Sequence, residues 1–226
     1  MMALDWVIIN NITVVLESPR DAIILQILQK LDITNIAWYS SGTVYGADEM
    51  YFACNTPALH PELWQKARYL LSKPKDEKTE DIILLKRTAQ NSHNGGRMLK
   101  NYATVLKRMR AKYGQKLVEF DSNKHNLNST ANTFSRAKWI VGSHGGALYN
   151  QLFAPSGTNV VEYMPVKTNG DLYLRHGGLM PYIFSSLLNQ KYWRITKIST
   201  DGNVNMLPGI PFENATSILK IANQSS

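Results

Sequence analysis

Residues 138–163 read KWIVGSHGGALYNQLFAPSGTNVVEY, and this stretch holds two strand-like runs separated by a turn and a helix-like run. Residues 138–142 are apolar after Lys138, and such a short continuous run is typical of a buried parallel strand. Gly145 and Gly146 favour a tight turn, residues 147–154 predict a helix, and residues 158–163 predict a second strand. A strand, a helix and another strand in this order indicate a parallel βαβ unit.

Similar alternation runs through most of the chain. We predict further strands at residues 6–16, 36–39, 50–54, 81–86, 117–120 and 192–196, and helices at residues 18–31, 61–71, 99–113, 127–137 and 179–189. The tail after residue 200 is expected to be irregular before a short last helix. The pattern predicts an α/β fold, a Rossmann-like parallel sheet with helices on both faces. A charged segment containing Pro74, residues 73–80, indicates a linker, which divides the chain into residues 1–74 and 75–226.

The amino-acid composition excludes several classes of protein. The chain has 226 residues, 44% of them hydrophobic, which is enough for a packed core and excludes a disordered or collagen-like protein. A formal charge of +8 indicates an anionic partner, which leaves phosphate, nucleic acid and an acidic lipid surface open. The single cysteine, Cys54, excludes an internal disulfide and a cysteine-built zinc site. No apolar run reaches the length of about 18 residues that a membrane-spanning helix needs, and the N-terminus lacks the features of a signal peptide.

The turn at residues 143–146 has the features of an anion site. Free backbone N–H groups at the start of a helix face the end of the preceding strand, and glycines let a phosphate approach the backbone closely. His144 adds a side-chain donor there. The spacing of the glycines does not match G-x-G-x-x-G, which argues against a nicotinamide or flavin enzyme. A plain tight turn with a helix cap remains the alternative, and the absence of G-x-S-x-G around Ser143 argues against a hydrolase.

A second candidate segment runs from residue 86 to residue 101, between a predicted strand and a predicted helix. Arg87 and Arg97 stand at its two ends, and we expect this loop to open at the same carboxyl edge of the sheet as His144. Residues 86–116 contain nine Lys or Arg and no Asp or Glu, so the positive charge is local. We interpret the basic residues 107–112 as a solvated helix face, and the two arginines as the better phosphate ligands because a guanidinium group grips two oxygens at once.

The two candidate segments resemble those of a known protein family. The run S-H-G-G-A-L-Y-N-Q-L-F-A-P-S-G-T-N-V-V-E-Y resembles the most diagnostic stretch of glycosyltransferase family 61, whose usual form is H-G-A-G-L-x-N-x-L-F-x-P-P-G-x-x-V-V-E. The upstream Leu-Leu-Lys-Arg87 and Arg97-x-Leu99-x-Asn101 are similar to that family as well. The resemblance covers residues 35–198 approximately. It departs from the family at His-Gly-Gly-Ala and Pro-Ser-Gly, and in a longer loop between Arg87 and Arg97.

The resemblance implies the C-terminal half of a GT-B-like glycosyltransferase. Residues 1–74 would then be the truncated end of an N-terminal, acceptor-side Rossmann-like domain, and residues 75–226 would be the nucleotide-sugar-binding Rossmann-like domain. The implied reaction moves a sugar of the GlcNAc, xylose or arabinose class from a UDP-sugar to a glycan or glycoprotein acceptor, with inversion. No metal and no cofactor besides the UDP-sugar substrate is expected, and the chain contains no convincing D-x-D site.

The expected roles follow from the same resemblance. The donor would be bound by Arg87, Arg97, Ser143, Gly145 and Gly146. His144 would stabilise the leaving phosphate. Inverting transfer also needs a general base, which the sequence does not identify.

Two further side chains are candidates for binding ribose, base or sugar hydroxyl groups. They are Asn150, about one helical turn after Gly146, and Glu162, at the end of the next predicted strand. A polar helix position and a satisfied strand-end acid are the equally weighted alternatives for these two residues.

Two other function classes stay open at this point. One is a non-catalytic nucleotide- or carbohydrate-binding fragment of such an enzyme. The other is a nucleic-acid-binding protein, which we do not expect because Tyr102 and Tyr113 fall on the apolar stripe of their predicted helix.

Localisation is inferred from the family and from glycosylation acceptors. Four Asn-x-Ser/Thr acceptor sequences lie at Asn11, Asn128, Asn214 and Asn223. Together with the family resemblance, they predict that the protein lies in the lumen of the endoplasmic reticulum or Golgi. Membrane association would need an anchor that is absent from this chain.

Overall fold

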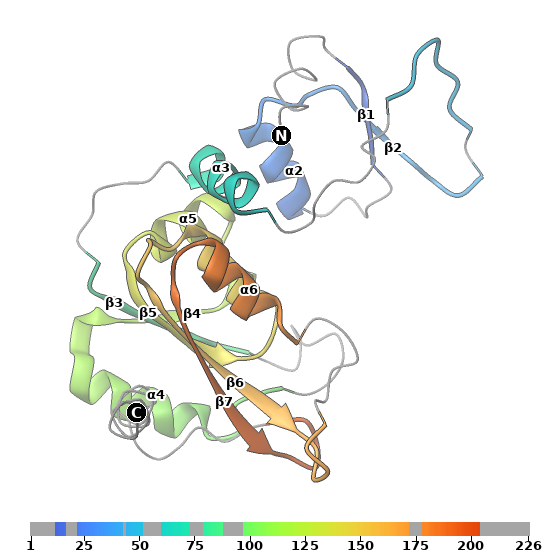
Figure 1. The fold of residues 1–226 in the computed structure, drawn as a ribbon. Coiled ribbons are helices and arrows are strands. Elements are labelled where there is room, and N and C mark those ends of the chain that lie inside the picture. The colour runs from blue at the N-terminus through green and yellow to red at the C-terminus, as the bar shows by residue number, and fades with distance from the viewer. Residues whose placement is uncertain are drawn as a thin grey trace. The chain divides into compact units, whose positions relative to one another are not determined.

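The computed structural model describes residues 12–16, 22–42, 44–51, 60–72, 79–87, 97–171 and 178–203. By its contacts the chain divides into two compact units, residues 1–73 and residues 74–226 (Figure 1). The second unit contains every site residue that the sequence analysis selected.

The first unit contains a small parallel βαβ arrangement. β1 (Val14–Leu16) pairs in parallel with β2 (Ile36–Trp38), and α2 (Ala22–Lys30) lies between them in the chain. α3 (Pro61–Ser72) follows and contacts α2.

Two strand predictions in this unit need correction. Residues 50 and 51 of the strand expected at 50–54 are irregular, and the other three lie outside the described residues. Both described side chains are more than half exposed, at 55% for Met50 and 59% for Tyr51, so no core face holds this segment in a sheet. Of the strand expected at 6–16, only residues 14–16 are seen as a strand, and residues 6–11 lie outside the described part.

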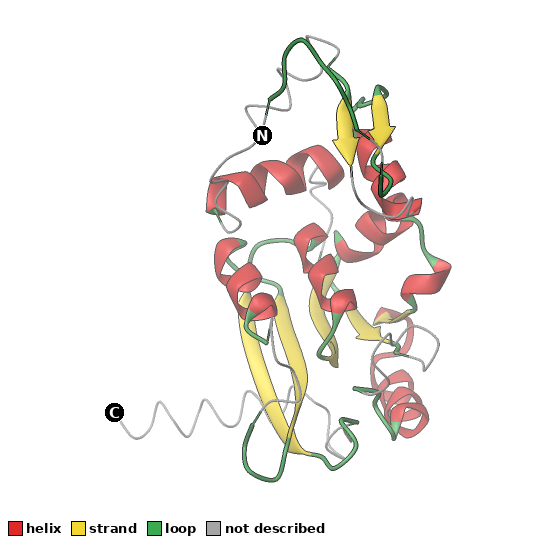
Figure 2. Ribbon diagram, turned by 90° about the vertical axis from the view of Figure 1, so that its right-hand side faces the viewer, coloured by secondary structure: helices red, strands yellow, loops and turns green. Residues whose placement is uncertain are grey.

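The second unit is built on a five-stranded sheet in which all neighbouring strands are parallel. In chain order the strands are β3 (Asp81–Leu85), β4 (Leu117–Phe120), β5 (Ala137–Ser143), β6 (Asn159–Val166) and β7 (Lys191–Ile198). Their spatial order is β4-β3-β5-β6-β7, and Figure 2 shows the long β6 and β7 side by side. The predicted parallel α/β sheet is confirmed.

Helices cover both faces of this sheet, as its Rossmann-like pattern predicted. α4 (Tyr102–Tyr113) lies on one face, and α5 (Leu127–Phe134) and α6 (Met180–Leu187) lie on the other (Figure 1). Short 3₁₀ helices complete the unit, at Gly114–Lys116 (η2), Ser122–Lys124 (η3) and Gly146–Phe153 (η4). No helix among the described residues is long and apolar enough to cross a membrane.

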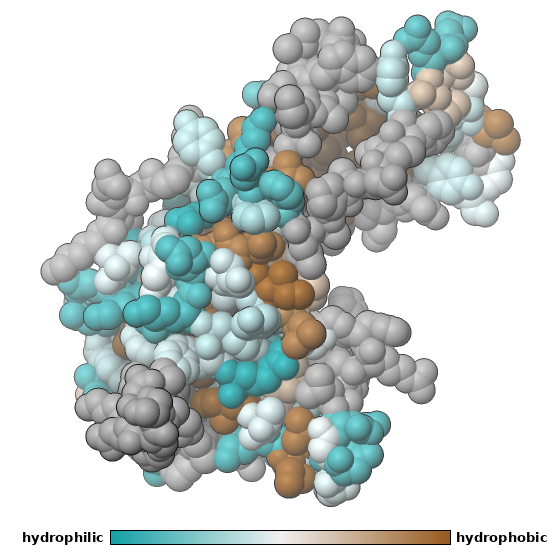
Figure 3. All heavy atoms as spheres, viewed as in Figure 1, coloured by the Kyte–Doolittle hydropathy of each residue, from teal (hydrophilic) through white to brown (hydrophobic). Residues whose placement is uncertain are grey.

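The two helical layers differ in what they expose. α4 turns its basic residues 107, 108, 110 and 112 outward, which confirms the predicted solvated face. The surface over α6 is partly hydrophobic (Figure 3), with Leu179 58% and Tyr182 53% exposed. The basic stretch 107–112 is therefore ordinary surface rather than a binding groove.

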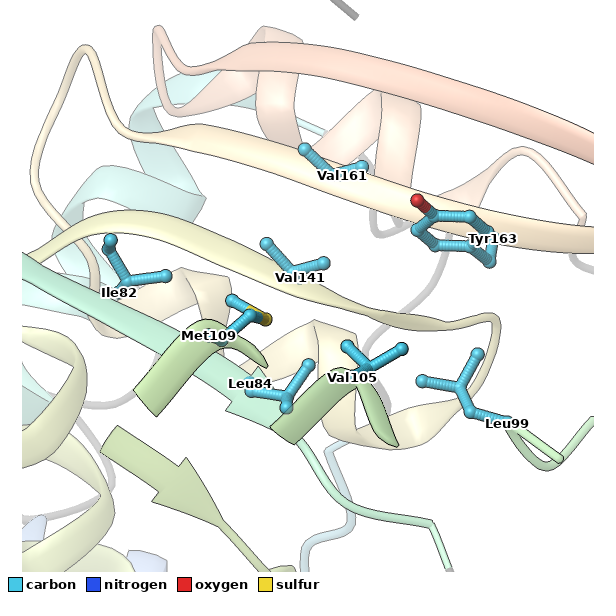
Figure 4. Packing of buried hydrophobic residues seen from close by; sticks show 8 residues of the cluster. All are labelled: Ile82, Leu84, Leu99, Val105, Met109, Val141, Val161 and Tyr163. Carbon is cyan, nitrogen blue, oxygen red and sulfur yellow. The ribbon is translucent and has the colours of Figure 1, made fainter. Parts of the chain in front are cut away.

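The core under α4 explains why these residues form strands. Val105 and Met109 project from α4 onto Leu84, Val141 and neighbouring residues of the sheet (Figure 4). The β3 run that reads as continuously apolar is buried at four successive positions, 82–85, as expected for a central parallel strand. Gly114, with φ of 54°, ends α4, and its N–H donates to the Arg110 carbonyl.

Three helix boundaries differ from the prediction. The helix expected at 147–154 is the 3₁₀ helix η4, with i→i−3 bonds from Leu148 N to Gly145 O and from Ala154 N to Gln151 O, both 3.0 Å. α5 ends at residue 134 because β5 already begins at residue 137. α4 begins at residue 102, because Leu99 instead forms an isolated strand bridge. The tail beyond residue 203 lies outside the described residues.

The strand order creates a topological switch point, where the chain reverses the direction in which it adds strands to the sheet. From β3 the chain moves to β4 at one edge, and it then returns past β3 to β5 and continues to β7. Neighbouring connections therefore leave β3 and β5 toward opposite faces, and in open α/β sheets ligands bind outside the carboxyl ends of the strands at such a point. Arg87 follows the end of β3, and His144 follows the end of β5.

Gly142 is expected to be intolerant of a side chain because it sits tightly against β3. A Cβ atom there would lie 2.7 Å from Leu85 Cβ and 2.9 Å from Leu85 Cδ1. We expect Gly142→Ala to lower the free energy of unfolding by about 1–3 kcal/mol, the usual effect of overpacking. Gly146→Ala is the matched control, since nothing lies within 4 Å of its Cβ position. Urea unfolding of both variants tests this, and equal stabilities would contradict it.

Candidate functional site

Arg87 links the ends of the two switch-point strands. Its Nη1 donates a hydrogen bond to the backbone carbonyl of His144 over 3.1 Å. The bond bridges the segment after β3 and the segment after β5, which are 57 residues apart in sequence. The two regions that the sequence analysis expected at one carboxyl edge are in contact.

Gly145 is needed for this contact. A Cβ atom at residue 145 would lie 1.8 Å from Arg87 Nη1, which is far closer than any side chain permits. The guanidinium group therefore occupies the space that a side chain at this position would fill. Gly146 differs, because nothing lies within 4 Å of its Cβ position.

Arg87 and Arg97 form a positively charged pair. Burial, and after it the positive charge of Arg97, lowers the pKa of Arg87 to about 10. Burial also lowers the pKa of Arg97, while nearby Tyr149 acts in the opposite direction. The Nε atom of Arg87 is buried without a hydrogen-bond partner. The site thus holds two partly desolvated positive charges beside each other.

Arg87 and Arg97 differ from most other basic residues of the 86–116 stretch in having no acidic partner in the part of the chain that the structure describes. Within the described ranges neither Arg87 nor Arg97 forms an ion pair with a carboxylate. Other basic residues of the 86–116 stretch do: Lys86 and Arg110 with Glu119 at 3.5 and 3.1 Å, Lys100 with Asp201 at 2.7 Å, and Lys116 with Glu80 at 3.0 Å. The local positive field expected from the sequence is concentrated at Arg87 and Arg97.

The backbone around Arg97 is anchored to the segment that follows β7. Arg97 has a φ of 65°, its N–H donates to Gly202 O at 2.7 Å, and Met98 N donates to Asn203 Oδ1 at 2.9 Å. Hydrogen bonds from Lys100 and then Asn203 lower the pKa of Asp201. Residues 88–96, between the two arginines, lie outside the described residues. Tertiary contacts, rather than a regular element, hold Arg97 in place.

His144 is buried and bonded to Glu162. His144 is 4% exposed and Glu162 is 0% exposed, and the imidazole Nδ1 is in hydrogen-bond contact with Glu162 Oε1. The backbone supports this pair, because Gly142 is in register with Glu162 and His144 N donates to Tyr163 O at 2.9 Å. The ring nitrogen that is not engaged with Glu162 is Nε2.

Two residues of β7 hold the other oxygen of Glu162. Arg194 Nε donates to Glu162 Oε2 at 3.0 Å, the Tyr192 hydroxyl donates to the same oxygen, and Arg194 Nη2 donates to Gly178 O. Burial, then the negative charge of Glu162, raises the pKa of Tyr192, so its hydroxyl stays a donor. Burial lowers the pKa of Arg194, but the charge of Glu162 and the interactions with Tyr192 together outweigh it, so the pKa of Arg194 is raised.

The burial of Glu162 argues against the ligand-binding role that the sequence analysis considered for it. A carboxylate that is 0% exposed and bonded to three side chains is not accessible to ribose or sugar hydroxyl groups. The alternative of a satisfied strand-end acid describes its environment better.

The remaining candidates lie around the turn. Ser143 is 6% exposed, and strand alternation directs its side chain to the opposite face of the sheet from that of His144. Asn150 Nδ2 donates to Ala147 O at 3.1 Å, within η4. The first N–H groups of a helix lack intrahelical partners, so the amides at Gly145 and Gly146 are available at this turn.

The sequence analysis missed three side chains at this edge: Tyr149, Tyr192 and Arg194. Tyr192 and Arg194 stand two residues apart in a predicted strand, a spacing that places both on one face, and an arginine inside that strand was the available signal. Tyr149 is 40% exposed, and its ring packs edge-on against Phe184 with centroids 5.3 Å apart. Burial, then the charge of Glu162, raises the pKa of Tyr149, while Arg97 opposes this.

A buried polar network keeps η4 in position. Gln151 is 0% exposed, its Nε2 donates to Pro181 O at 3.1 Å, and Ser185 Oγ donates to its Oε1 at 2.8 Å. Gln190 Nε2 donates to the carbonyls of Gln151 at 2.9 Å and Ala154 at 3.1 Å. The C-terminal end of η4 is thereby tied to α6 and to Gln190, the residue before β7. No group of three or more His, Cys, Asp or Glu side chains suited to a metal ion occurs among the described residues.

Chemically, the site suits an anion with several oxygens. The Arg87 guanidinium bonds to the backbone of His144 at the carboxyl ends of β3 and β5, the charge of Arg97 acts on Arg87, and η4 begins directly after this turn. Charge-assisted hydrogen bonds of this kind bind phosphate, and they stabilise negative charge that develops on a leaving group.

Comparisons with known proteins agree with this arrangement. Over 117 residues, which are 50% of this chain and 19% of the relative, the chain is 30% identical to the human protein O-linked-mannose beta-1,4-N-acetylglucosaminyltransferase 2. The mouse protein of the same name is 31% identical over 94 residues, covering 42% of this chain and 15% of that protein. The matched part is thus about a fifth or less of the length of these curated relatives.

The family match is broader. The sequence model of the Glycosyltransferase 61 family matches residues 6–161, more than half of the chain, and includes Arg87, Arg97 and the turn at His144. This chain therefore belongs to glycosyltransferase family 61.

Proposed function

We propose that this chain binds the nucleotide-sugar donor of a glycosyltransferase that transfers a sugar from a UDP-sugar to a glycan or glycoprotein acceptor, with inversion. One observation carries the proposal: Arg87 and Arg97 are partly buried, lack acidic partners in the described structure, and lie at the switch-point edge with His144 and Gly145. Burying two positive charges side by side opposes folding, and a bound diphosphate would offset that cost.

The mechanism follows from where charge builds up. As the bond between the sugar and the diphosphate breaks, negative charge grows on the phosphate oxygens. In the proposal the guanidinium groups of Arg87 and Arg97, the imidazole of His144 and the amides of Gly145 and Gly146 stabilise this charge. These groups supply the neutralisation, and the proposed reaction does not require a metal ion. The acceptor hydroxyl needs a general base, to which we assign no residue.

The two units take different roles in this proposal. Residues 75–226 bind the donor, and residues 1–74 are the end of an acceptor-side domain in a GT-B-like arrangement. The relatives' names suggest GlcNAc as the sugar and O-linked mannose as its acceptor. We also propose a secretory-pathway lumen as the location, with support from the sequon at Asn128, which is exposed on α5.

A second candidate function has an observation in its favour. The matched region spans 19% of the human relative, so groups outside this chain can be needed for turnover. The chain would then be a non-catalytic nucleotide- or carbohydrate-binding fragment of such an enzyme.

Loss of any of the three side chains proposed to bind the diphosphate should weaken UDP binding. We expect Arg87→Ala, Arg97→Ala and His144→Ala each to raise the Kd for UDP by about 10- to 100-fold, since a hydrogen bond to a charged group contributes about 1.5–3 kcal/mol. Isothermal titration calorimetry measures this. Lys107→Ala, on the exposed side of α4, is the matched control for loss of one positive charge. An equal loss of affinity in Lys107→Ala would indicate unspecific attraction and contradict the site.

A substitution at Gly145 gives an independent test of the contact between Gly145 and Arg87. Gly145→Ala should displace the Arg87 guanidinium, because the new Cβ would lie 1.8 Å from its Nη1, and should weaken UDP binding nearly as much as Arg87→Ala. Gly46→Ala is the control, because Gly46 lies outside the proposed site and nothing lies within 4 Å of its Cβ position, so its affinity should stay within twofold of the unchanged protein. The proposed contact between Arg87 and the ligand is wrong if the two variants bind UDP equally well.

Sugar transfer separates the two candidate functions. With UDP-GlcNAc and an O-mannosylated peptide, the proposal predicts a β-linked GlcNAc product, detected by mass spectrometry and by the anomeric coupling in proton NMR. His144→Ala should lower the rate at saturating donor. UDP binding without transfer, across a panel of UDP-sugars and mannosylated acceptors, would favour the non-catalytic alternative.

A further inference from the structure

We propose that Glu162 is a positioning residue that holds His144 in the tautomer with the proton on Nδ1, so that Nε2 is the ring nitrogen presented to the donor diphosphate. The inference deepens the proposed function and rests on it only where the diphosphate is concerned. The tautomer itself is a property of the free protein.

The direction of the hydrogen bond follows from the partners of Glu162. Its carboxylate receives hydrogen bonds from Tyr192 and Arg194, and the Arg194 guanidinium supplies the compensating charge. An ionised carboxylate accepts hydrogen bonds and cannot donate them. The contact between His144 Nδ1 and Glu162 Oε1 therefore requires the proton on Nδ1.

The backbone leaves the pair little freedom to rearrange. Glu162 lies in register with Gly142 on one side and with Arg194 on the other. His144 follows two residues after Gly142, so strand alternation places His144, Glu162 and Arg194 on the same face of the sheet. Arg194 is in turn bonded to Gly178 O, and the Tyr192 ring packs against Tyr182 with centroids 5.7 Å apart. Because His144 and Glu162 are 4% and 0% exposed, water does not compete effectively for the contact.

A fixed tautomer has a chemical consequence. A neutral imidazole with its proton on Nδ1 has a lone pair on Nε2, and can only accept a hydrogen bond there. To donate to a phosphate oxygen, Nε2 must take up a second proton from the solvent. The role of His144 in stabilising a leaving phosphate therefore couples donor binding to the uptake of a proton.

The charged groups around His144 favour that coupling. Arg87 and Arg97 approach from the segment after β3, Arg194 and Tyr192 from β7, Glu162 from β6 and Tyr149 from η4. Three guanidinium groups against one carboxylate leave a net positive charge around the imidazole in the free protein. The two negative charges of a bound diphosphate would cancel that net charge.

NMR of the free protein tests the tautomer directly. In protein labelled with ¹⁵N in its five histidines, long-range proton–nitrogen correlations at pH 8 distinguish the two neutral tautomers, and His144→Gln assigns the His144 signals. We expect the Nδ1–H form for His144. In Glu162→Gln we expect the Nε2–H form to become populated, whereas in Tyr192→Phe, which keeps the carboxylate, the Nδ1–H form should persist. An Nε2–H tautomer in the unchanged protein overturns the proposal without any variant.

Proton uptake tests the consequence. UDP-N-acetylglucosamine is a suitable probe because its diphosphate has no ionisation near neutral pH. Calorimetry at pH 7.5 in HEPES and in Tris, which differ in ionisation enthalpy, yields the number of protons bound. We expect uptake approaching one proton per ligand for the unchanged protein and none for His144→Gln. Glu162→Gln should show reduced uptake, since its neutral imidazole can donate from Nε2.

The NMR experiment tests the tautomer of His144, and the calorimetry tests proton uptake on donor binding. Binding without proton uptake, together with the Nδ1–H tautomer, would overturn the coupling of His144 to the phosphate. If no UDP-sugar binds, the proposed function fails, and the NMR result still decides the positioning role of Glu162. If Glu162→Gln does not fold, the unchanged protein and His144→Gln decide both claims.

Discussion

The contact between the Arg87 guanidinium and the backbone of residues 144 and 145 is the constraint on which the site depends. It requires β3 and β5 to be neighbours, which the return of the chain past β3 provides. It also requires glycine at residue 145, because the guanidinium occupies the space of a Cβ atom. One hydrogen bond thus connects the topology of the sheet, the composition of the turn and the position of a positive charge.

The distribution of charge explains how a basic protein makes a specific anion site. Most of the surplus lies on the solvated side of α4 or is paired with acids such as Glu119 and Asp201. Water and counter-ions screen such charges, so they contribute little. Arg87 and Arg97 are instead partly desolvated and unpaired within the described structure, and their lowered pKa values reflect that cost. An anionic ligand bound there would interact with charges that are only weakly screened.

Two buried polar networks make this edge rigid. The first runs from His144 through Glu162 to Tyr192 and Arg194 across three strands, and the second ties η4 to α6 through Gln151. Both satisfy polar atoms that burial would otherwise leave unpaired at a cost of about 1–3 kcal/mol each. Because the partners come from different strands and helices, the turn at residues 143–146 is fixed by the sheet and does not depend on its own short sequence.

The amino-acid sequence by itself determined the parallel α/β class, the strands of the second unit and the family, and it predicted that Arg87 and His144 lie at one edge of the sheet. Apolar runs such as residues 82–85 and the glycine turn after Ser143 are local patterns, and local patterns predict elements and the edge to which they lead. The short first unit was less well predicted, since the segment at Met50 has strand-like residues but no core face to hold them. Only tertiary structure decided that η4 is a 3₁₀ helix, that Glu162 is enclosed, and that Tyr192 and Arg194 are its partners. Those features depend on contacts between strands about 30 residues apart, and on burial, which arises only when the strands are assembled into a sheet.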